Sequence, residues 1–290
     1  MKIASLFSEK TVFSFEIFPP KKTSPIETVY DTLEALQDLK PDFISVTFGA
    51  GGSGNGENTL AIARRLKEHY GVLPMAHLPC IHYTKEQIDN ILKQFQENGI
   101  ENVLALRGDR VEGWSRHGLR PRCRPHQLYP QQDGSFDIAG ACYPECHPEA
   151  QHGHGHPHLK EKVDAGASHL ITQLFFDNDS FYDFRYRAAR SGVNVPIEAG
   201  IMPVTNRKQI ERMVTMCGAS LPRKFTKMVQ RFEDNPEALR DAGIAYAIDQ
   251  IVDLVTDGVD GIHLYTMNNP YVARKISEAV NGIIKAAPKC

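Results

Sequence analysis

The chain has 290 residues, of which 41% are hydrophobic and 23% are charged. These proportions are ordinary for a folded, soluble protein and exclude global disorder. Lys and Arg total 33 against 35 for Asp and Glu, a formal net charge of −2, so the composition argues against a general binder of nucleic acid or anionic membranes.

The N-terminal sequence and the cysteines point to the cytoplasm. The N-terminal segment MKIASLFSEKTVFSFEIFPP lacks the apolar core and small-residue cleavage site of a signal peptide. No apolar run approaches the roughly 18 residues that a membrane-spanning helix needs. The 6 cysteines are too sparse for a disulfide framework, and the C-x3-C pair Cys142 and Cys146 has neither a zinc-knuckle nor a thioredoxin spacing. We therefore expect a cytoplasmic protein with free thiols and no membrane association.

Short apolar runs alternate along the chain with longer stretches of helical spacing, which is the pattern of parallel β-α-β units. The runs predict strands over Val12–Phe18, Phe43–Thr47, Leu73–Leu78, Asn102–Arg107, Asp137–Tyr143, His169–Phe176, Val195–Ile201 and Gly261–Tyr265. The stretches between them predict helices over Ile26–Leu39, Thr59–His69, Lys85–Asn98, Ser180–Ser191, Asn206–Cys217, Pro236–Thr256 and Tyr271–Lys285.

This order of elements predicts an α/β fold, a (β/α)8 TIM barrel. No linker or composition shift divides the chain, so we expect residues 1–290 to form a single domain. A doubly wound sheet is disfavoured because no G-x-G-x-x-G motif follows a predicted strand. Two windows break the pattern: residues 110–134 combine several prolines with no helical periodicity, and residues 151–158 read QHGHGHPH. Both are predicted to be irregular loops.

Polar residues stand at the carboxyl ends of the predicted strands, where the chemistry of a (β/α)8 barrel collects. Glu16 lies in an apolar run, and a carboxyl group desolvated by such neighbours has a raised pKa that suits a general acid; an ion-paired core carboxylate is the alternative. Gln173 lies among apolar residues and needs partners that a bound heterocycle would supply. The same rim carries Thr47, His77, Arg107, Asp109 and Tyr143. This mixture suits a large planar heterocycle better than a metal.

Three further patterns are less specific. The glycine-rich turn at residues 49–54 would let backbone N–H groups approach a phosphate, but flexible loops share that composition. Arg107 and Asp109 fit a structural ion pair as well as a ligand site. Several histidines between residues 147 and 158 have a spacing compatible with zinc or nickel. Their glycines and prolines favour a flexible surface tract, so we predict no physiological metal site.

Read together, the strand ends resemble methylenetetrahydrofolate reductases of the bacterial type. The combination of FSFEIFPPK, ALRGD and ITQLFFD is specific to that family. The segments that carry the resemblance occur in the family's order: Phe13–Lys21, Phe43–Ser53, Ala76–Cys80, Asn102–Asp109, Tyr143–Ala150, Leu159–Asp177, Gly200–Asn206 and His263–Asn268.

The resemblance implies that NAD(P)H reduces a bound FAD, which passes a hydride to 5,10-methylenetetrahydrofolate and gives 5-methyltetrahydrofolate for methionine synthesis. Glu16 falls on the family's general acid, and Asp109 on the aspartate near both flavin and pterin. Gln173 and Gln209 match substrate contacts, Gln173 serving nicotinamide and folate in turn, which implies ping-pong kinetics. The positions that match FAD contacts are Thr47, Phe48, Ala50, His77, Arg107, Gly108, Asp109, Tyr143, His147, His158 and Lys162.

The chain departs from the family pattern in both irregular windows. In the family, each window contains a residue that contacts FAD, and the counterpart of the second contact falls near Gly155. Asn269 stands where some members have an arginine that contacts folate. Because the family pattern resumes in register after each window, we hypothesise local reading-frame disturbances at 110–134 and 151–158. Genuine loops are the alternative, and they would weaken FAD binding.

Two other functions stay open: a metal-dependent aldolase or lyase that uses the histidine tract, and a non-catalytic relative that binds flavin or folate without turnover. The resemblance implies NADH as the usual reductant, with NADPH the alternative. It also implies small-molecule partners and a homo-oligomer, commonly a tetramer among relatives, whereas the expectation of no nucleic-acid partner comes from the charge balance.

Overall fold

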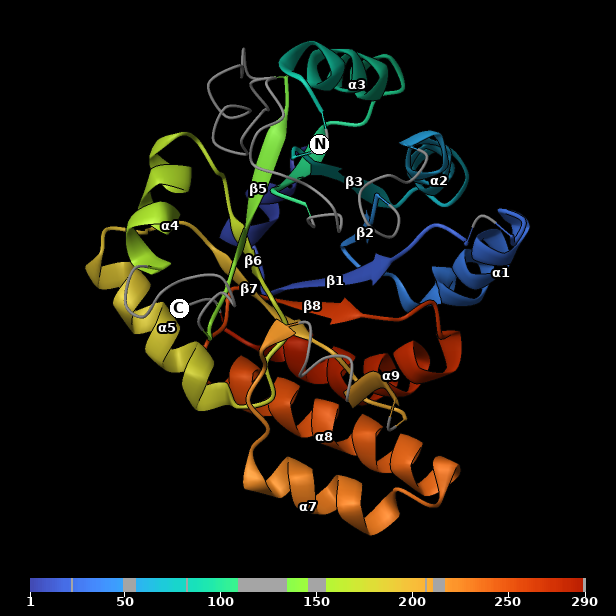
Figure 1. Ribbon diagram of the computed structural model, residues 1–290, viewed down its shortest axis with the longest axis vertical. Coiled ribbons are helices and arrows are strands. Elements are labelled where there is room, and N and C mark those ends of the chain that lie inside the picture. The colour runs from blue at the N-terminus through green and yellow to red at the C-terminus, as the bar shows by residue number, and fades with distance from the viewer. Residues whose placement is uncertain are drawn as a thin grey trace, which may run out of the picture.

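The computed structural model describes residues 1–21, 23–48, 56–81, 83–108, 135–145, 155–206, 208–210 and 217–288, with residues 155–158 described by backbone only. The strands are parallel and close into a barrel in chain order, each bonded to the next and the last to the first (Figure 1). The predicted (β/α)8 barrel is therefore confirmed. Its strands are β1 (Val12–Ile17), β2 (Phe43–Val46), β3 (Leu73–Pro79), β4 (Asn102–Leu106), β5 (Asp137–Cys142), β6 (Leu170–Thr172), β7 (Ile197–Ile201) and β8 (Gly261–Tyr265).

Helices surround the barrel as an outer layer (Figure 1). Their starts follow local chemistry: Thr84 and Gln87 form a capping box, and Asn235 and Asn269 cap helices whose first residue is proline. The helices are η1 (Ile3–Ser8), α1 (Glu27–Leu36), η2 (Gln37–Leu39), α2 (Gly56–His69), α3 (Lys85–Glu97), α4 (Gly155–Asp164), α5 (Asn178–Arg190), α7 (Arg223–Phe232), α8 (Pro236–Thr256) and α9 (Pro270–Ala286).

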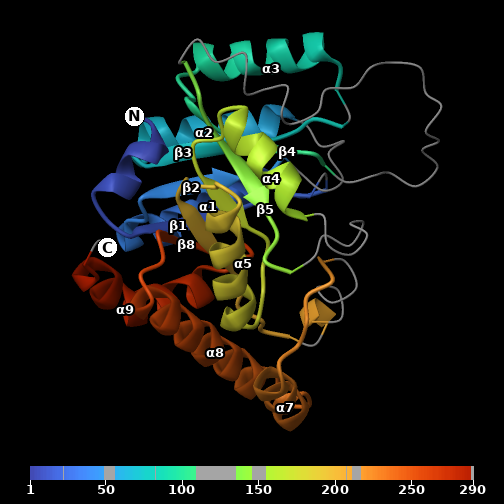
Figure 2. The ribbon, with the colours of Figure 1, turned by 90° about the vertical axis from the view of Figure 1, so that its left-hand side faces the viewer.

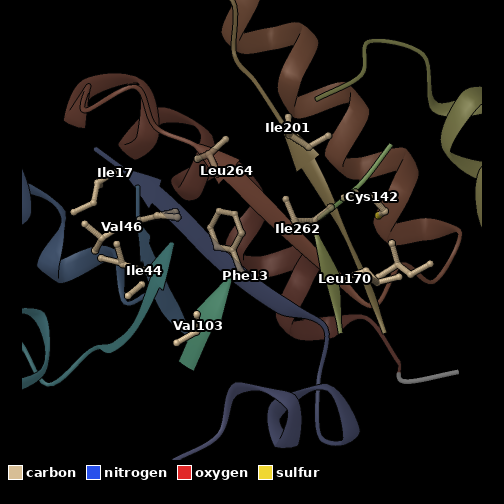
Figure 3. Packing of buried hydrophobic residues seen from close by; sticks show 14 of the residues in the cluster. Phe13, Ile17, Ile44, Val46, Val103, Cys142, Leu170, Ile201, Ile262 and Leu264 are labelled. Atoms are coloured by element: carbon tan, nitrogen blue, oxygen red, sulfur yellow. The ribbon is translucent and has the colours of Figure 1, made fainter. Parts of the chain in front are cut away.

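The main core lies between the strands and the helices. Alternate residues of each strand point outward into it, as Phe13 and Ile17 of β1 and Ile262 of β8 do in Figure 3. The inward residues at the amino end of the barrel form a second apolar cluster with Ile3 and Phe7 of η1. Figure 2 shows η1 at this end of the barrel. The amino end is therefore closed by packing, and the opposite end is left to carry a site.

The structure corrects two predicted boundaries and adds one helix. Strand β6 ends at Thr172, four residues before its predicted end at Phe176, because the Leu174 N–H bonds to the Gln173 side chain instead of a neighbouring strand. Helix α4 begins at Gly155, inside the window 151–158 that was predicted to be irregular. Its proline is tolerated because N–H groups in a first turn have no intrahelical acceptor. Helix α7, which no prediction covered, is an additional helix before α8.

Several other predictions fall outside the described residues. These are the window 110–134, residues 151–154 of the second window, the glycine-rich turn, and most of the helix predicted over Asn206–Cys217. Among the described cysteines, Cys80, Cys142 and Cys217 form no disulfide, as expected for Cys142. None of the described helices is both long enough and apolar enough to span a membrane.

Candidate active site

The carboxyl ends of the strands form one rim, because all the strands run parallel. Glu16 is the next-to-last residue of β1, and His77 lies two residues before the end of β3. Four more of the predicted site residues directly follow the ends of β2, β4, β5 and β6: Thr47, Arg107, Tyr143 and Gln173. The fold therefore brings the described strand-end residues to the same end of the barrel.

Glu16 faces two histidines across the barrel interior. Its Oε2 lies 3.6 Å from Nε2 of His77 on β3 and 3.8 Å from Nε2 of His263 on β8. Burial lowers the pKa of His77 to about 4 and outweighs the opposite effect of the Glu16 carboxylate. His77 is therefore uncharged at neutral pH, and its contact with Glu16 is not an ion pair.

Glu16 reaches this position through the alternation of side chains along β1. Its apolar neighbours Phe15 and Ile17 point outward into the helix-facing core, whereas Glu16 points into the barrel. The side chain of Glu16 is 21% exposed. The environment thus differs from the predicted one, since the adjacent apolar residues cover the other face of the strand and do not enclose the carboxyl group.

The barrel interior beneath Glu16 holds buried polar residues that the sequence analysis did not single out: Ser14, Ser45, Glu198 and His263. Ser14 Oγ lies 2.9 Å from Glu198 Oε1 and 2.6 Å from Nδ1 of His263. Each of them is a polar residue in an otherwise apolar strand, and each lies two positions from another residue that points into the barrel. The outward residues on either side obscured that signal, because they make each strand look uniformly apolar.

Two observations test whether the described residues fit a flavin nucleotide. Lys162 of α4 is half-buried, its Nζ donates to the Ala141 carbonyl over 2.7 Å, and burial lowers its pKa. No carboxylate among the described residues pairs with Lys162, so this cation fits an anionic ligand such as a phosphate. His77 Nε2 is buried and hydrogen-bonds to no described residue, which suits contact with a bound heterocycle. The described residues therefore fit the expected cofactor.

The turn after β4 has a conformation that requires glycine. Gly108 has a φ of +89°, in the left-handed region that other residues rarely adopt. It follows Arg107, which is exposed at the rim. The turn therefore presents a cation next to a backbone free of a side chain, an arrangement that allows close approach of a ligand.

Both predicted substrate glutamines are held by short local hydrogen bonds. Gln173 Oε1 accepts from the Leu174 N–H at 3.0 Å, and Gln209 Oε1 accepts from the Thr205 N–H at 3.0 Å and from its hydroxyl at 3.1 Å. Neither amide nitrogen hydrogen-bonds to a described residue. The two side chains are thus fixed by their oxygens and keep a donor group for a ligand.

Some of the remaining predicted FAD contacts lie within the described residues, and the others lie outside them. Thr47 accepts a hydrogen bond at its carbonyl from Thr59 Oγ1 at 3.0 Å, Phe48 is buried against the Tyr83 ring, and Tyr143 is half-buried. Outside the described residues lie Ala50, Asp109 and His147, together with the side chain of His158. In the part of the chain that the structure describes, no group of three or more His, Cys, Asp or Glu side chains could hold a metal ion.

Comparison with known proteins agrees with this architecture. A sequence profile described as "Methylenetetrahydrofolate reductase" matches residues 2–281. A solved structure described as an uncharacterized protein from Clostridium thermocellum that binds two copies of 5-methyl-5,6,7,8-tetrahydrofolic acid superimposes with a TM-score of 0.63. The match covers 96% of this chain and 97% of that chain at 16% identity, so it supports the fold alone.

Named relatives define the family. The chain is 38% identical over 258 residues to 5,10-methylenetetrahydrofolate reductase of Pectobacterium carotovorum, covering 88% of this chain and 85% of that protein. Identity to the enzyme of the same name from Escherichia coli K12 is 36%, with coverage of 88% and 86%. The chain is also 36% identical to Methylenetetrahydrofolate reductase (NADH) 1 of Arabidopsis thaliana, of which it spans 48%. With a profile match along nearly its whole length, the chain belongs to the methylenetetrahydrofolate reductase family.

Proposed function

We propose that the protein reduces 5,10-methylenetetrahydrofolate to 5-methyltetrahydrofolate with electrons from NAD(P)H, using FAD as the hydride carrier. The observation that carries this proposal is the placement of Glu16, which projects into the carboxyl end of a barrel whose family is that of the reductase. When bound, the flavin supplies the hydride-transfer chemistry that no side chain can provide. The protein's own residues bind, orient and move protons.

Glu16 is proposed as the general acid. Reduction of the methylene group requires the folate's bridging ring to open, and a proton delivered to its nitrogen makes that nitrogen a better leaving group. The carboxyl group is partly exposed at the mouth, so a substrate can reach it. Because His77 is uncharged at neutral pH, its contact with Glu16 introduces no cation beside the proposed acid.

The cofactor would be held from several strands at once. Lys162 and Arg107 supply positive charge for its phosphates, and His77 supplies a buried ring nitrogen. We assign the other contacts to Thr47, Phe48, Ala50, Gly108, Asp109, Tyr143, His147 and His158 on the family resemblance. Asp109, Gln173 and Gln209 are the proposed folate contacts, with Asp109 also catalytic.

We also propose that Gln173 meets nicotinamide and folate in turn, which makes the kinetics ping-pong. Initial rates of NADH oxidation at several fixed concentrations of methylenetetrahydrofolate test this directly. Parallel double-reciprocal lines are expected, and intersecting lines would exclude alternating use of one site. Repeating the assay with NADPH identifies the preferred reductant. We further propose that the protein is cytoplasmic and forms a homo-oligomer, commonly a tetramer in relatives. Light scattering in solution measures the oligomeric state.

A further inference from the structure

A line of buried polar groups connects the barrel core to Glu16. Glu198 of β7, Ser14 of β1 and His263 of β8 are each 0% exposed. Glu198 Oε1 lies 2.9 Å from Ser14 Oγ, which lies 2.6 Å from Nδ1 of His263. The other ring nitrogen, Nε2, lies 3.3 Å from Ser45 Oγ and 3.8 Å from Glu16 Oε2. The line therefore runs from a carboxyl group in the core to the one at the mouth.

The barrel makes specific room for Glu198. Glu198 pairs in register with Gly261 of β8. A Cβ at Gly261 would lie 2.8 Å from Cγ of Glu198 and 3.1 Å from its Oε1, so any other residue there would displace the carboxyl group. Glu198 is thus accommodated by a glycine directly opposite, in a layer that also contains Ser14 and His263.

Glu198 is a neutral acid in this environment. Its Oε2 is buried and hydrogen-bonds to no described residue. Burial raises its pKa well above the usual value, a hydrogen bond donated by Ser14 to the ionised form lowers it by less, and the carboxylates of Asp42 and Asp260 raise it further. The titratable group on its other side, beyond Ser14, is His263. A carboxyl group with these neighbours keeps its proton at neutral pH.

The position of that proton fixes the direction of the hydrogen bonds. A proton on Oε2 would be a buried donor without an acceptor, whereas a proton on Oε1 faces Ser14 Oγ. With Glu198 donating, the Ser14 hydroxyl directs its own hydrogen to Nδ1 of His263 at 2.6 Å, which is closer than the other acceptor, the Ile262 carbonyl oxygen at 3.4 Å. A neutral imidazole that accepts at Nδ1 carries its proton on Nε2, the nitrogen that faces Glu16.

We propose that Glu198 is a positioning residue whose proton orders Ser14 so that His263 presents an Nε2–H group to Glu16. This N–H group would stabilise the carboxylate left when Glu16 gives up its proton, after a side-chain movement of about 1 Å brings the two within hydrogen-bond range. The tautomer follows from the geometry of the buried line, and its role in proton transfer rests on the proposed function.

The tautomer can be measured without substrate or cofactor turnover. A long-range ¹H–¹⁵N correlation spectrum of the full-length protein labelled with ¹⁵N-histidine distinguishes the two neutral forms of each ring. The His263 signals are identified by their absence from a His263→Asn variant. We expect the Nε2–H form near neutral pH. Observation of the Nδ1–H form in the unsubstituted protein would overturn the proposal, because Ser14 would then donate to Glu198.

Matched variants of Glu198 test its role. Glu198→Gln retains an NH donor toward Ser14, so it should preserve the Nε2–H form. Glu198→Leu removes the donor and should yield mixed tautomers, with oxidation of the reduced enzyme by methylenetetrahydrofolate slowed about tenfold and reduction by NADH unchanged. A Glu198→Leu protein with the Nε2–H form and an unchanged folate rate would contradict the proposal. If the protein showed no reductase activity, the proposed function would fail while the NMR result still decided the tautomer.

Discussion

Oε2 of Glu16 lies 3.6 Å from Nε2 of His77, and the imidazole is uncharged at neutral pH because burial lowers its pKa to about 4. The proposed acid therefore faces a neutral ring on β3 and, 3.8 Å away, the ring of His263 on β8. Neither distance is that of a hydrogen bond. This arrangement leaves the Glu16 carboxyl group open to a substrate entering at the mouth.

Replacing Glu16 with glutamine removes the proposed acid and keeps the side-chain shape. We expect Glu16→Gln to slow oxidation of the reduced enzyme by methylenetetrahydrofolate about 10²- to 10⁴-fold, the usual contribution of a positioned acid. Reduction by NADH should be unchanged, because that step needs no proton from Glu16. Stopped-flow absorbance separates the two steps. Glu278→Gln, on the exposed face of α9, is the matched control and should alter neither rate. An unimpaired folate step in Glu16→Gln would eliminate Glu16 as the acid.

Lys162 should contribute to cofactor binding through its charge. Lys162→Met keeps much of the stem and removes the ammonium group, and a lost charge-assisted hydrogen bond corresponds to about 10- to 100-fold weaker FAD binding. Fluorescence titration of the apoprotein with FAD measures this change. Lys160→Met is the control, since Lys160 lies two residues away on α4 and pairs with Asp164. Equal affinities for Lys162→Met and the unsubstituted protein would place the phosphates elsewhere.

Two helix glycines should respond oppositely to alanine. A Cβ at Gly243 of α8 would lie 1.8 Å from the Val204 carbonyl oxygen, so Gly243→Ala must displace the backbone and should lower the free energy of unfolding by about 1–3 kcal/mol or more. Gly282 of α9 has nothing within 4 Å of such a Cβ, and Gly282→Ala should raise that free energy by about 0.5–1 kcal/mol. Urea denaturation measures the free energy of unfolding of both variants. Similar changes in the two variants would contradict the packing of α8 on the segment after β7.

His169 should make stability depend on pH. Burial lowers its pKa from 6.5 to about 4, so the unfolded chain holds more protons between these values and stability must fall as the pH falls through this window. Each such histidine adds a slope of up to about 1.4 kcal/mol per pH unit. Denaturation measured across this range should show a shallower slope for His169→Gln. His69→Gln, at the exposed end of α2, is the control. Equal slopes for the two variants would disprove burial of an uncharged His169.

The barrel was predictable because its signal is repeated. Each buried strand is a short apolar run followed by a helical stretch, and one uncertain boundary does not change the number of strands. The Leu170–Thr172 strand shows the limit of that signal. Phe175 and Phe176 look like a continuation of the strand, but they follow a residue whose N–H group bonds to the Gln173 side chain. The hydrophobic pattern of the sequence does not predict that local hydrogen bond.

The site was predictable at its rim and not in its interior. Glu16, His77 and Gln173 follow from strand ends and family resemblance. Ser14 and Glu198 belong to the site only because three strands, β1, β7 and β8, are adjacent in the closed barrel. Their contact joins residues 184 positions apart, so neither residue indicates the other in the sequence.

An anaerobic absorbance spectrum of the purified protein, recorded before and after NADH and then after methylenetetrahydrofolate, tests the central claim most directly. The proposed reductase should show flavin absorption that NADH bleaches and methylenetetrahydrofolate restores. A protein that stays colourless after reconstitution with FAD, or a bound flavin that NADH does not bleach, would contradict the claim.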